Sequence, residues 1–342
     1  DTPFRRSRPY PQPPHRFTKP EEVLKAAFPD TFFHQPTARS RVGTAKRAAC
    51  CASSVCHLCP VKAKFTVQND MAEVYQDPRV TLEFEARVDS LEMAGGEVKG
   101  VVYYQDRPKK AMGEMVVLGA NALFNPHIMM RSGIDHKWLG KGLNEQASKV
   151  VVVELDGLDN FQGSTSLTGH GYMLYDGEHR KDHAAMLIET QNVPNIRLEQ
   201  GKWQQRLVMK FIAEDLPSRR NYVSLDRTQP EKPVAVYEGH SDYTERAFDS
   251  LEKTLPQMLS ALPIERIEIP DEPVDTEAHI QGTTRMGHNP DESVIDANLV
   301  HHQYRNLVVV GSGVFPSCPP ANPSLTIAAL SLRSADKLFA PA

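Results

Sequence analysis

The 342-residue sequence lacks several features that would fix its class at once. It has no run of about eighteen apolar residues, so it encodes no transmembrane helix. Its first residues lack a starting Met and the apolar core of a signal peptide, and we therefore expect that residue 1 is not the start of the gene product. A formal net charge of −4 argues against nucleic acid as the main partner.

A dinucleotide-binding fingerprint is also absent. Such a fingerprint is a strand, the pattern Gly-x-Gly-x-x-Gly and a helix, followed about twenty positions later by an acidic residue. Residues 311–313 have two of the three glycines and lie near the end of the chain. We therefore expect that these residues alone do not hold an adenosine pyrophosphate, and that a further segment or a separate subunit binds it.

The segment from 279 to 336 combines a candidate base, a buried strand and a helix start. Residues 307–310 form a β-branched apolar run closed by Gly-Ser-Gly, which predicts a strand buried on both faces with a ligand crevice at its carboxyl end. Asn322 is a favoured N-cap and Pro323 suits the first helical position, so a helix is expected to begin there. Its first-turn amides would form an anion site. The apolar residues that follow at helical spacing are Leu325, Ala328, Ala329 and Leu332.

His279 is the candidate proton acceptor of this segment, although a lone His is more often structural than catalytic. Oxidation of an alcohol to a carbonyl requires a base for the hydroxyl proton and an acceptor for hydride. Because no side chain accepts hydride, the reaction needs a cofactor. A neutral imidazole is a competent base at about neutral pH.

The run from His279 onward resembles the C-terminal signature of the glucose-methanol-choline (GMC) family of flavin oxidoreductases. In that signature a His opens an H-x-x-G-T segment, and an Asn-Pro or a His follows near the flavin. The resemblance implies that His279 is the catalytic base, that Asn322 orients the developing carbonyl oxygen, and that the cofactor is FAD. A capping role for Asn322 is about as well supported by the sequence. The positions implied near the flavin in this segment are Gly311, Ser312, Pro323, Ser324, Leu325 and Thr326.

Residues 114–122 predict a second element near the flavin. An apolar strand is followed by the small-residue turn Gly119-Ala120-Asn121 and a helix, and small residues let backbone approach a ligand closely. The segment resembles a GMC element in which glycine is commoner at the position of Asn121. A plain strand-helix unit without a ligand is the other interpretation.

The fold implied by the resemblance is a mixed α/β GMC-type flavoprotein fold that lacks its N-terminal Rossmann βαβ unit. Residues 1–146 are expected to form the remainder of the FAD-binding domain, with a proline-rich arm and a cysteine cluster. Residues 147–275 are expected to form an antiparallel-sheet substrate domain, and residues 276–342 to return to the FAD-binding domain. Residues 140–146 resemble the family's loop into the substrate domain.

Local patterns predict the individual elements. A helix is expected at 21–27, and a longer one at 241–262 that Pro256 kinks or ends early. Alternation of apolar and polar residues predicts strands in the N-terminal half of the chain, with a hairpin turn at 94–97. The strands expected there are 80–84, 87–91 and 98–104, and those expected in the substrate sheet are 150–154, 184–189, 207–212, 222–225 and 234–237.

Four of the five cysteines lie within residues 50–59. Such close spacing favours an iron-sulfur cluster over buried or disulfide-bonded thiols, and over a zinc site completed by His57 or Cys50. The run resembles the cysteine segment of the bacterial glucose, fructose and gluconate dehydrogenases of the family, which holds a three-iron (3Fe-4S) cluster beside the flavin. That resemblance implies Cys51, Cys56 and Cys59 as ligands, although here only two residues separate the last pair.

The resemblance also implies a function and its partners. We expect an FAD-dependent dehydrogenase that oxidises a sugar or polyol alcohol and passes electrons through the cluster to an external acceptor such as a cytochrome. A small helper subunit and a periplasmic or periplasm-facing, membrane-associated location go with that subgroup, and a cytoplasmic location is the alternative. Two rivals remain: an oxygen-using GMC alcohol oxidase without a cluster, and a non-catalytic subunit that has lost flavin binding.

Overall fold

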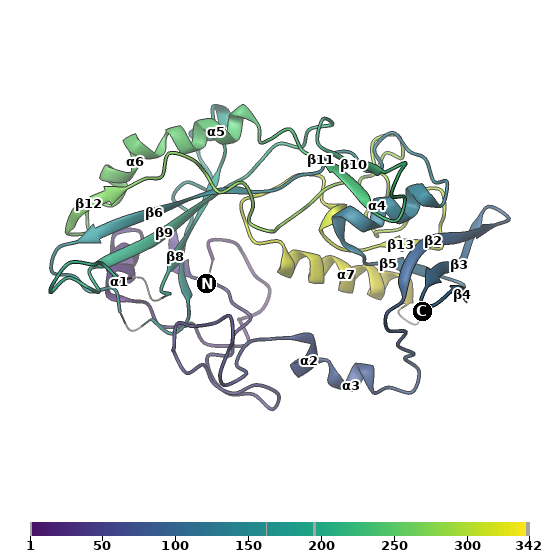
Figure 1. The fold of residues 1–342 in the computed structure, drawn as a ribbon. Coiled ribbons are helices and arrows are strands. Elements are labelled where there is room, and N and C mark those ends of the chain that lie inside the picture. The colour runs from purple at the N-terminus through teal and green to yellow at the C-terminus, as the bar shows by residue number, and fades with distance from the viewer. Residues whose placement is uncertain (1, 162, 194–195, 340–342) are drawn as a thin grey trace. The chain divides into compact units, whose positions relative to one another are not determined.

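The fold is that of a computed structural model, which describes residues 2–161, 163–193 and 196–339 (Figure 1). Groups of successive strands are separated by helices, and the described residues include the short 3₁₀ turns Glu178–Lys181 and Ser312–Val314. The α-helices are α1 (Lys19–Ala27), α2 (Val67–Asp70), α3 (Ala72–Tyr75), α4 (Asn121–Arg131), α5 (Asp242–Asp249), α6 (Leu251–Met258) and α7 (Ser324–Phe339). The strands are β1 (Phe32–His34), β2 (Arg87–Ala94), β3 (Glu97–Tyr104), β4 (Pro108–Met112), β5 (Val116–Leu118), β6 (Ala147–Leu155), β7 (Leu167–Gly171), β8 (Met186–Gln191), β9 (Arg206–Ala213), β10 (Tyr222–Leu225), β11 (Pro233–Val236), β12 (Ile264–Glu268) and β13 (Leu307–Val309).

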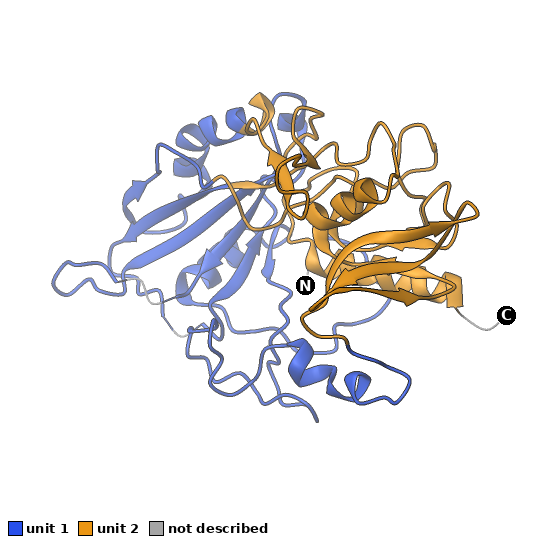
Figure 2. Cartoon of the chain, turned by 45° about the vertical axis from the view of Figure 1, so that its right-hand side comes forward, with its two compact units in different colours: residues 1–82, 148–213, 245–274 blue, residues 83–147, 214–244, 275–342 orange. Residues whose placement is uncertain are grey.

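The chain divides into two compact units and passes between them several times (Figure 2). Unit 1 contains residues 1–82, 148–213 and 245–274, and unit 2 contains residues 83–147, 214–244 and 275–342. Within the described residues, no helix is both long enough and apolar enough to cross a membrane.

Unit 1 is built on a six-stranded sheet with the order β1-β7-β8-β9-β6-β12. The neighbours β1 and β7, β7 and β8, β8 and β9, and β6 and β12 pair antiparallel. The strands are rich in buried β-branched and long apolar residues such as Ile188, Met209 and Phe211, which is why they form the core of the unit. The expected strands 150–154, 184–189 and 207–212 correspond to β6, β8 and β9.

The expected strands 222–225 and 234–237 exist as β10 and β11, but they do not join the large sheet. They form a two-stranded hairpin of their own in unit 2. The amide of Val223 on β10 donates to the carbonyl of Gly140, at 2.8 Å. A loop, rather than the large sheet, therefore provides a hydrogen-bond partner for the backbone of this strand. Periodicity predicts that a segment is a strand, but not which neighbour it pairs with.

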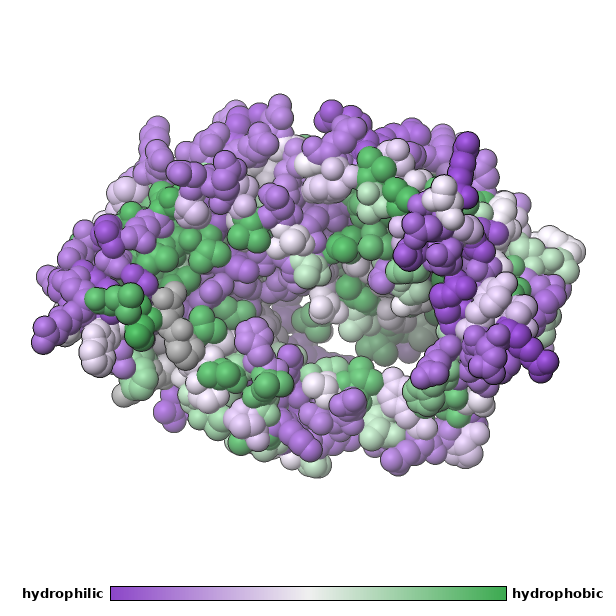
Figure 3. Space-filling view, in the orientation of Figure 1, coloured by the Kyte–Doolittle hydropathy of each residue, from purple (hydrophilic) through white to green (hydrophobic). Residues whose placement is uncertain are grey.

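The expected helix 241–262 is broken, but not at Pro256. It ends as α5 at Asp249 and resumes as α6 at Leu251, and Pro256 lies inside α6. The hydroxyl of Ser250 donates to the carbonyl of Ala247 at 2.7 Å, a local bond that competes with the helical ladder. Leu251 and Leu255 of α6 are buried, and hydrophilic side chains cover the outer side of both helices (Figure 3).

Unit 2 contains the antiparallel sheet β2-β3-β4 and a parallel pair, β5 and β13, with α4 packed nearby. The hairpin turn at 94–97 joins β2 to β3 as expected. Residues 80–84, however, form no strand and pair with no strand of the described residues, and the side chains of Val80, Leu82 and Phe84 are exposed.

Helix α7 differs from its prediction in its start and in its buried face. The amide of Ile327 donates to the carbonyl of Pro323 at 2.9 Å, which makes Pro323, rather than Asn322, the last residue before the helix. Leu325 is 72% exposed and Leu332 is 67% exposed, whereas Ile327 and Leu330 pack against the core of unit 2. The helix carries two apolar stripes, and the neighbouring strands cover only one of them.

Candidate active site

The carboxyl ends of β5 and β13 bring two of the predicted cofactor segments together. These strands are parallel neighbours, with Leu118 paired to Val309, so Gly119 and Gly311 follow at the same edge. The buried side chain of Asn125 ties the two turns together: its Oδ1 accepts from the amide of Ala120 at 2.7 Å, and its Nδ2 donates to the carbonyl of Val310 at 3.0 Å.

Asn121 opens helix α4 in the left-handed region, with φ of 70°. Glycine tolerates that conformation best and Asn is among the few other residues that adopt it, which explains physically why either residue suits this turn. The Asn121 Oδ1 accepts from the amides of Leu123 at 2.9 Å and Phe124 at 3.1 Å and so caps the helix. Asn121 itself is exposed, so the turn is open to a ligand.

The segment that follows His279 is tightly built against its surroundings. Gly282 has φ of 76°, and a Cβ there would lie 1.9 Å from the carbonyl oxygen of Gly142, so only glycine fits. The amide of Thr284 donates to the carbonyl of Gly313 at 2.9 Å, which lays this segment along the turn after β13. The histidine segment and the second predicted cofactor turn are therefore neighbours.

Two non-glycine residues on either side of His279 have left-handed backbone, Ala278 with φ of 59° and Thr283 with φ of 78°. A β-branched residue in that region is strained and must be held by its surroundings. The hydroxyl of buried Thr283 donates to the carbonyl of Ala122 at 2.6 Å, and its own carbonyl accepts from the amide of Gly140 at 2.7 Å. Strain of this kind is typical of functional segments.

The side chains of Glu145 and Gln146 hold His279 in place. The two carboxylate oxygens of Glu145 each lie 3.0 Å from the backbone amide of His279, and Oε2 also accepts from the hydroxyl of Thr276 at 2.8 Å. The Nδ1 of His279 lies 2.7 Å from Oε1 of Gln146. Both holding residues are buried, while His279 is half-buried.

The same Gln146 side chain reaches the loop before Asn322. Its Nε2 donates to the carbonyls of Pro319 and, at 3.0 Å, of Ala321. Thus one amide joins the candidate base to the chain that carries the second predicted catalytic residue. Asn322 is exposed, and Pro323, which follows it, is buried. The sequence did not lead us to assign roles to Glu145 and Gln146. The local signal for these two residues is that they are polar and directly precede the buried strand β6.

A second polar cluster in unit 2 surrounds Asp215, which is 3% exposed. Its Oδ1 accepts from the hydroxyls of Ser241 at 2.6 Å and Thr244 at 2.9 Å, and its Oδ2 lies 3.1 Å from Nδ1 of His240. Burial raises the pKa of Asp215, but these hydrogen bonds, that of His240 first, outweigh it and leave the pKa lowered.

The pKa of His240 moves in the opposite direction. Burial lowers it, and the hydrogen bond and negative charge of Asp215 outweigh burial, so the pKa of His240 is raised. The other ring nitrogen, Nε2, lies 3.1 Å from the carbonyl of Asp275, at the start of the chain that leads to His279. With an acceptor at each nitrogen, His240 is set up as an imidazolium. Sequence reasoning treats it as a surface or structural residue, and a structural role fits.

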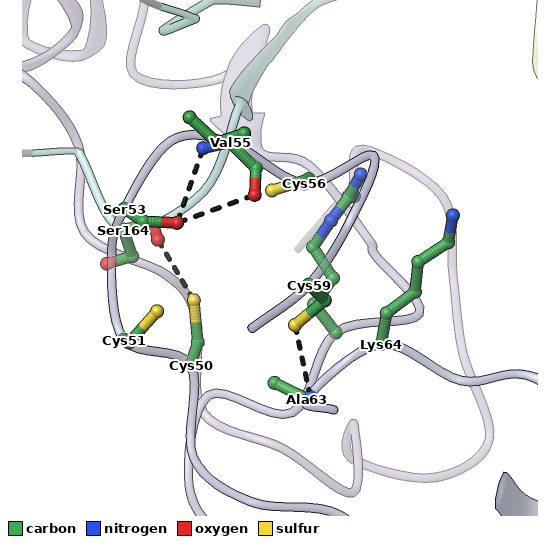
Figure 4. A pocket seen from close by; sticks show the side chains of 10 residues that line it. Cys50, Cys51, Ser53, Val55, Cys56, Cys59, Ala63, Lys64 and Ser164 are labelled. Atoms are coloured by element: carbon green, nitrogen blue, oxygen red, sulfur yellow. Dashed lines mark hydrogen bonds between the residues drawn. The ribbon is translucent and has the colours of Figure 1, made fainter. Parts of the chain in front are cut away.

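In unit 1 the cysteines at 50–59 line one small pocket together with Arg39 and Lys64 (Figure 4). The Cys50 thiol donates to the carbonyl of Ser164 at 3.0 Å, and the amide of Ala63 donates to Cys59 Sγ at 3.3 Å. The sulfur atoms lie around the pocket and do not meet at one point.

The thiols differ in how readily they ionise. Burial opposes ionisation of Cys56 and Cys59, but hydrogen bonds to Cys56 from Ser166 and to Cys59 from nearby amides outweigh it, so the pKa of each is lowered. Burial raises the pKa of Cys50. The described residues contain no group of three His, Cys, Asp or Glu side chains placed to hold a metal ion. As arranged here, Cys51, Cys56 and Cys59 therefore do not form a ligand set, and we derive no electron-transfer step through them.

The residues around the β5 and β13 edge do fit a flavin. Ser324 to Thr326 in the first turn of α7, like Gly119, are exposed, and a Cβ on Gly311 would meet only open space. The Oγ1 of Thr284 is buried and has no hydrogen-bond partner within the described part of the chain. An open edge lined by small residues lets a ring system approach the backbone closely.

Comparison with known proteins shows which proteins this chain resembles. Residues 217–331 match the family model of GMC oxidoreductases. The chain is 29% identical to C-glycoside 3-oxidase of Arthrobacter globiformis over 78% of this chain and 55% of that protein. It is 24% identical to the fructose dehydrogenase large subunit of Gluconobacter japonicus over 97% of this chain and 66% of that protein.

Solved structures share the fold at low sequence identity. The structure of pyridoxine 4-oxidase from Mesorbium loti aligns with a TM-score of 0.59 and 18% identity, covering 81% of this chain and 62% of that one. A structure of Aspergillus oryzae formate oxidase, studied for modification of its FAD, aligns with a TM-score of 0.57 and 16% identity, covering 77% and 61%. Residues 217–331 are therefore similar to GMC oxidoreductases, and the chain spans about half to two thirds of the length of these relatives.

Proposed function

We propose that this chain carries the catalytic histidine and the substrate-binding part of an FAD-dependent oxidoreductase that oxidises an alcohol group of a sugar or polyol to a carbonyl. The observation that carries the proposal is the fixed imidazole of His279, held by Gln146 beside the chain that leads to Asn322. A base in a set position next to an open edge of small residues suits proton abstraction from a bound alcohol.

In the proposed reaction His279 accepts the hydroxyl proton of the substrate. Glu145 holds the backbone of His279 through its amide, and the exposed Asn322 is placed to hydrogen-bond the oxygen as it becomes a carbonyl. FAD, when bound, supplies the hydride acceptor that the side chains lack. The amides at the start of α7 would favour negative charge beside them.

The proposal includes an FAD-binding segment beyond the described residues, on this polypeptide or on a separate subunit. Three observations support it. Among the described residues the parallel sheet contains only β5 and β13, and Val117 on β5 is 51% exposed. The outward apolar stripe of α7, which contains Leu325 and Leu332, is exposed. Parallel sheets are normally covered on both faces, so more chain is needed here. The relatives are longer, which leaves length for such a segment.

The substrate class rests on the relatives. C-glycoside 3-oxidase and fructose dehydrogenase are named for sugars, and this supports a sugar or polyol for the present chain. The electron acceptor depends on the cysteines. An iron-sulfur cluster, a cytochrome acceptor, a helper subunit and a periplasm-facing location remain predictions from sequence, and the pocket that gathers four thiols bears on the cluster alone. Direct use of oxygen is the second candidate, because the thiols do not form a ligand set as arranged.

The test is an absorption spectrum of the native protein with intact mass spectrometry, an iron assay and turnover on a panel of sugars and polyols. Bound flavin with sugar-dependent turnover would support the proposal, and about three irons per chain would favour the cluster. Peroxide formation without iron would favour the oxidase. Absence of flavin and of turnover, with the complete gene product present, would favour a non-catalytic subunit.

A further inference from the structure

Gln146 has a geometry that determines which nitrogen of His279 carries a proton. The side-chain amide of Gln146 is completely buried and contacts three groups: the carbonyls of Pro319 and Ala321 at one end, and the imidazole of His279 at the other. A carbonyl oxygen can only accept a hydrogen bond. The end of the amide that faces the two carbonyls must therefore be the NH₂ group.

The orientation of the amide leaves its oxygen facing His279. Oε1 of Gln146 lies 2.7 Å from Nδ1, and because this oxygen can only accept, Nδ1 must donate. A neutral imidazole has one N–H, so its other nitrogen is then the acceptor. Turning the amide over would place its oxygen against two carbonyl oxygens and lose both of those bonds.

We propose that Gln146 is a positioning residue that holds neutral His279 as the Nδ1–H tautomer and thereby makes Nε2 the nitrogen that takes the substrate proton. This inference deepens the proposed function and rests on His279 as the base. The proton balance is simple: the substrate O–H bond breaks, a new bond forms between that proton and Nε2, and the resulting imidazolium keeps Nδ1–H on Gln146. Glu145 adds the second restraint, since its carboxylate holds the backbone amide of His279.

The tautomer is measured directly by nitrogen-15 NMR of the imidazoles in the flavin-loaded protein, above the pH at which His279 is protonated. The signals of His279 are identified as those absent from a His279→Gln variant. We expect a protonated Nδ1 and an unprotonated Nε2 in the wild type. A wild-type His279 with its proton mainly on Nε2 would overturn the proposal without any variant being needed.

Two variants separate positioning from folding. Gln146→Leu removes the acceptor, and we expect it to reduce the Nδ1–H population and lower kcat about tenfold to a hundredfold with little change in KM. Gln281→Leu is the matched control, because Gln281 is an equally buried amide two residues from His279 whose Nε2 lies 3.4 Å from Sγ of Cys318.

The outcomes are distinguishable from those of the proposed function. An unchanged Nδ1–H population in Gln146→Leu, or an equal loss of that signal in Gln281→Leu, would refute the positioning role of Gln146. Normal turnover in His279→Gln would refute His279 as the base and hence the proposed function, whatever tautomer the spectrum shows.

Discussion

The histidine segment at 279–284 and the cysteine segment at 50–59 differ in how far the folded chain itself arranges them. The imidazole of His279 has a fixed partner at 2.7 Å, and strained backbone around it is pinned by buried hydrogen bonds. The thiols share a pocket, yet no three side chains among the described residues are placed to hold a metal ion. An acid-base site can be completed by packing, whereas a metal site is completed only when its ion binds.

The sharpest test of the packed segment is Gly282→Ala. The added Cβ would meet the carbonyl oxygen of Gly142 at 1.9 Å in a left-handed backbone, and we expect a loss of about 4 kcal/mol or more in the free energy of unfolding. Gly133→Ala is the control: its φ of 78° is similar and nothing lies within 4 Å of the Cβ, so about 1 kcal/mol is expected. Equal losses in thermal or denaturant unfolding would show that the segment is not tightly packed.

Thiol labelling tests how exposed the cysteine segment at 50–59 is. In reduced protein stripped of metal, we expect exposed Cys51 and low-pKa Cys59 to be alkylated at least about a hundredfold faster than Cys318. Cys318 is 1% exposed, and burial raises its pKa. Peptide mass spectrometry over time gives the three rates. Labelling of Cys318 as fast as Cys51 would contradict the described burial.

The Asp215–His240 pair predicts a pH dependence of stability. The pKa of His240 is raised from 6.5, so its contribution is complete below that value and is lost as the pH rises through the folded-state pKa. The pKa of Asp215 is lowered from 3.8, so its contribution is present above that value and is lost as the pH falls through the folded-state pKa. A tenfold change in the proton affinity of either group on folding corresponds to about 1.4 kcal/mol of stability.

The measurement is the Tm of wild type and of His240→Gln from mildly acidic to mildly alkaline pH. We expect the wild type to lose stability above about pH 6.5 and the variant to lack that step. Since His240 also bonds the carbonyl of Asp275, the loss should be accompanied by faster amide exchange in the chain before His279. An identical pH profile in both proteins would contradict the ion pair.

The smallest effect is expected in the cysteine loop. Ala52 has φ of 54°, so Ala52→Gly removes the cost of a left-handed alanine but makes the unfolded chain more flexible. These effects oppose each other, and the free energy of unfolding should change by less than about 1 kcal/mol. A loss as large as that of Gly282→Ala would mean that the cysteine loop is packed as tightly as the histidine segment.

Local patterns predicted much of the fold. Alternation and apolar runs located β2, β3, β6, β8, β9 and β13, and the fold class agrees with the solved structures that the chain resembles. The sequence did not predict which strands pair with each other: β10 and β11 were identified as strands but assigned to the wrong sheet. The helix break fell at Ser250, where a side chain competes with the backbone, and not at the more conspicuous Pro256.

The site was only partly visible for a similar reason. His279 and Asn322 stand in a recognisable run, but the bond from His279 to Gln146 joins residues 133 positions apart. The buried face of α7 could not be read from its own sequence, because both of its stripes are apolar and the surrounding chain selects one. Long-range contacts decide these points, and spacing along one sequence does not encode them directly.

The most direct test of the central claim is anaerobic reduction of the bound flavin by sugar, in wild type and in His279→Ala, each loaded with FAD. If His279 is the base, the flavin absorbance of the wild type falls when an oxidisable sugar or polyol is added. The variant retains its flavin but is reduced about a hundredfold to ten-thousandfold more slowly. Equal rates in the two proteins would contradict the account.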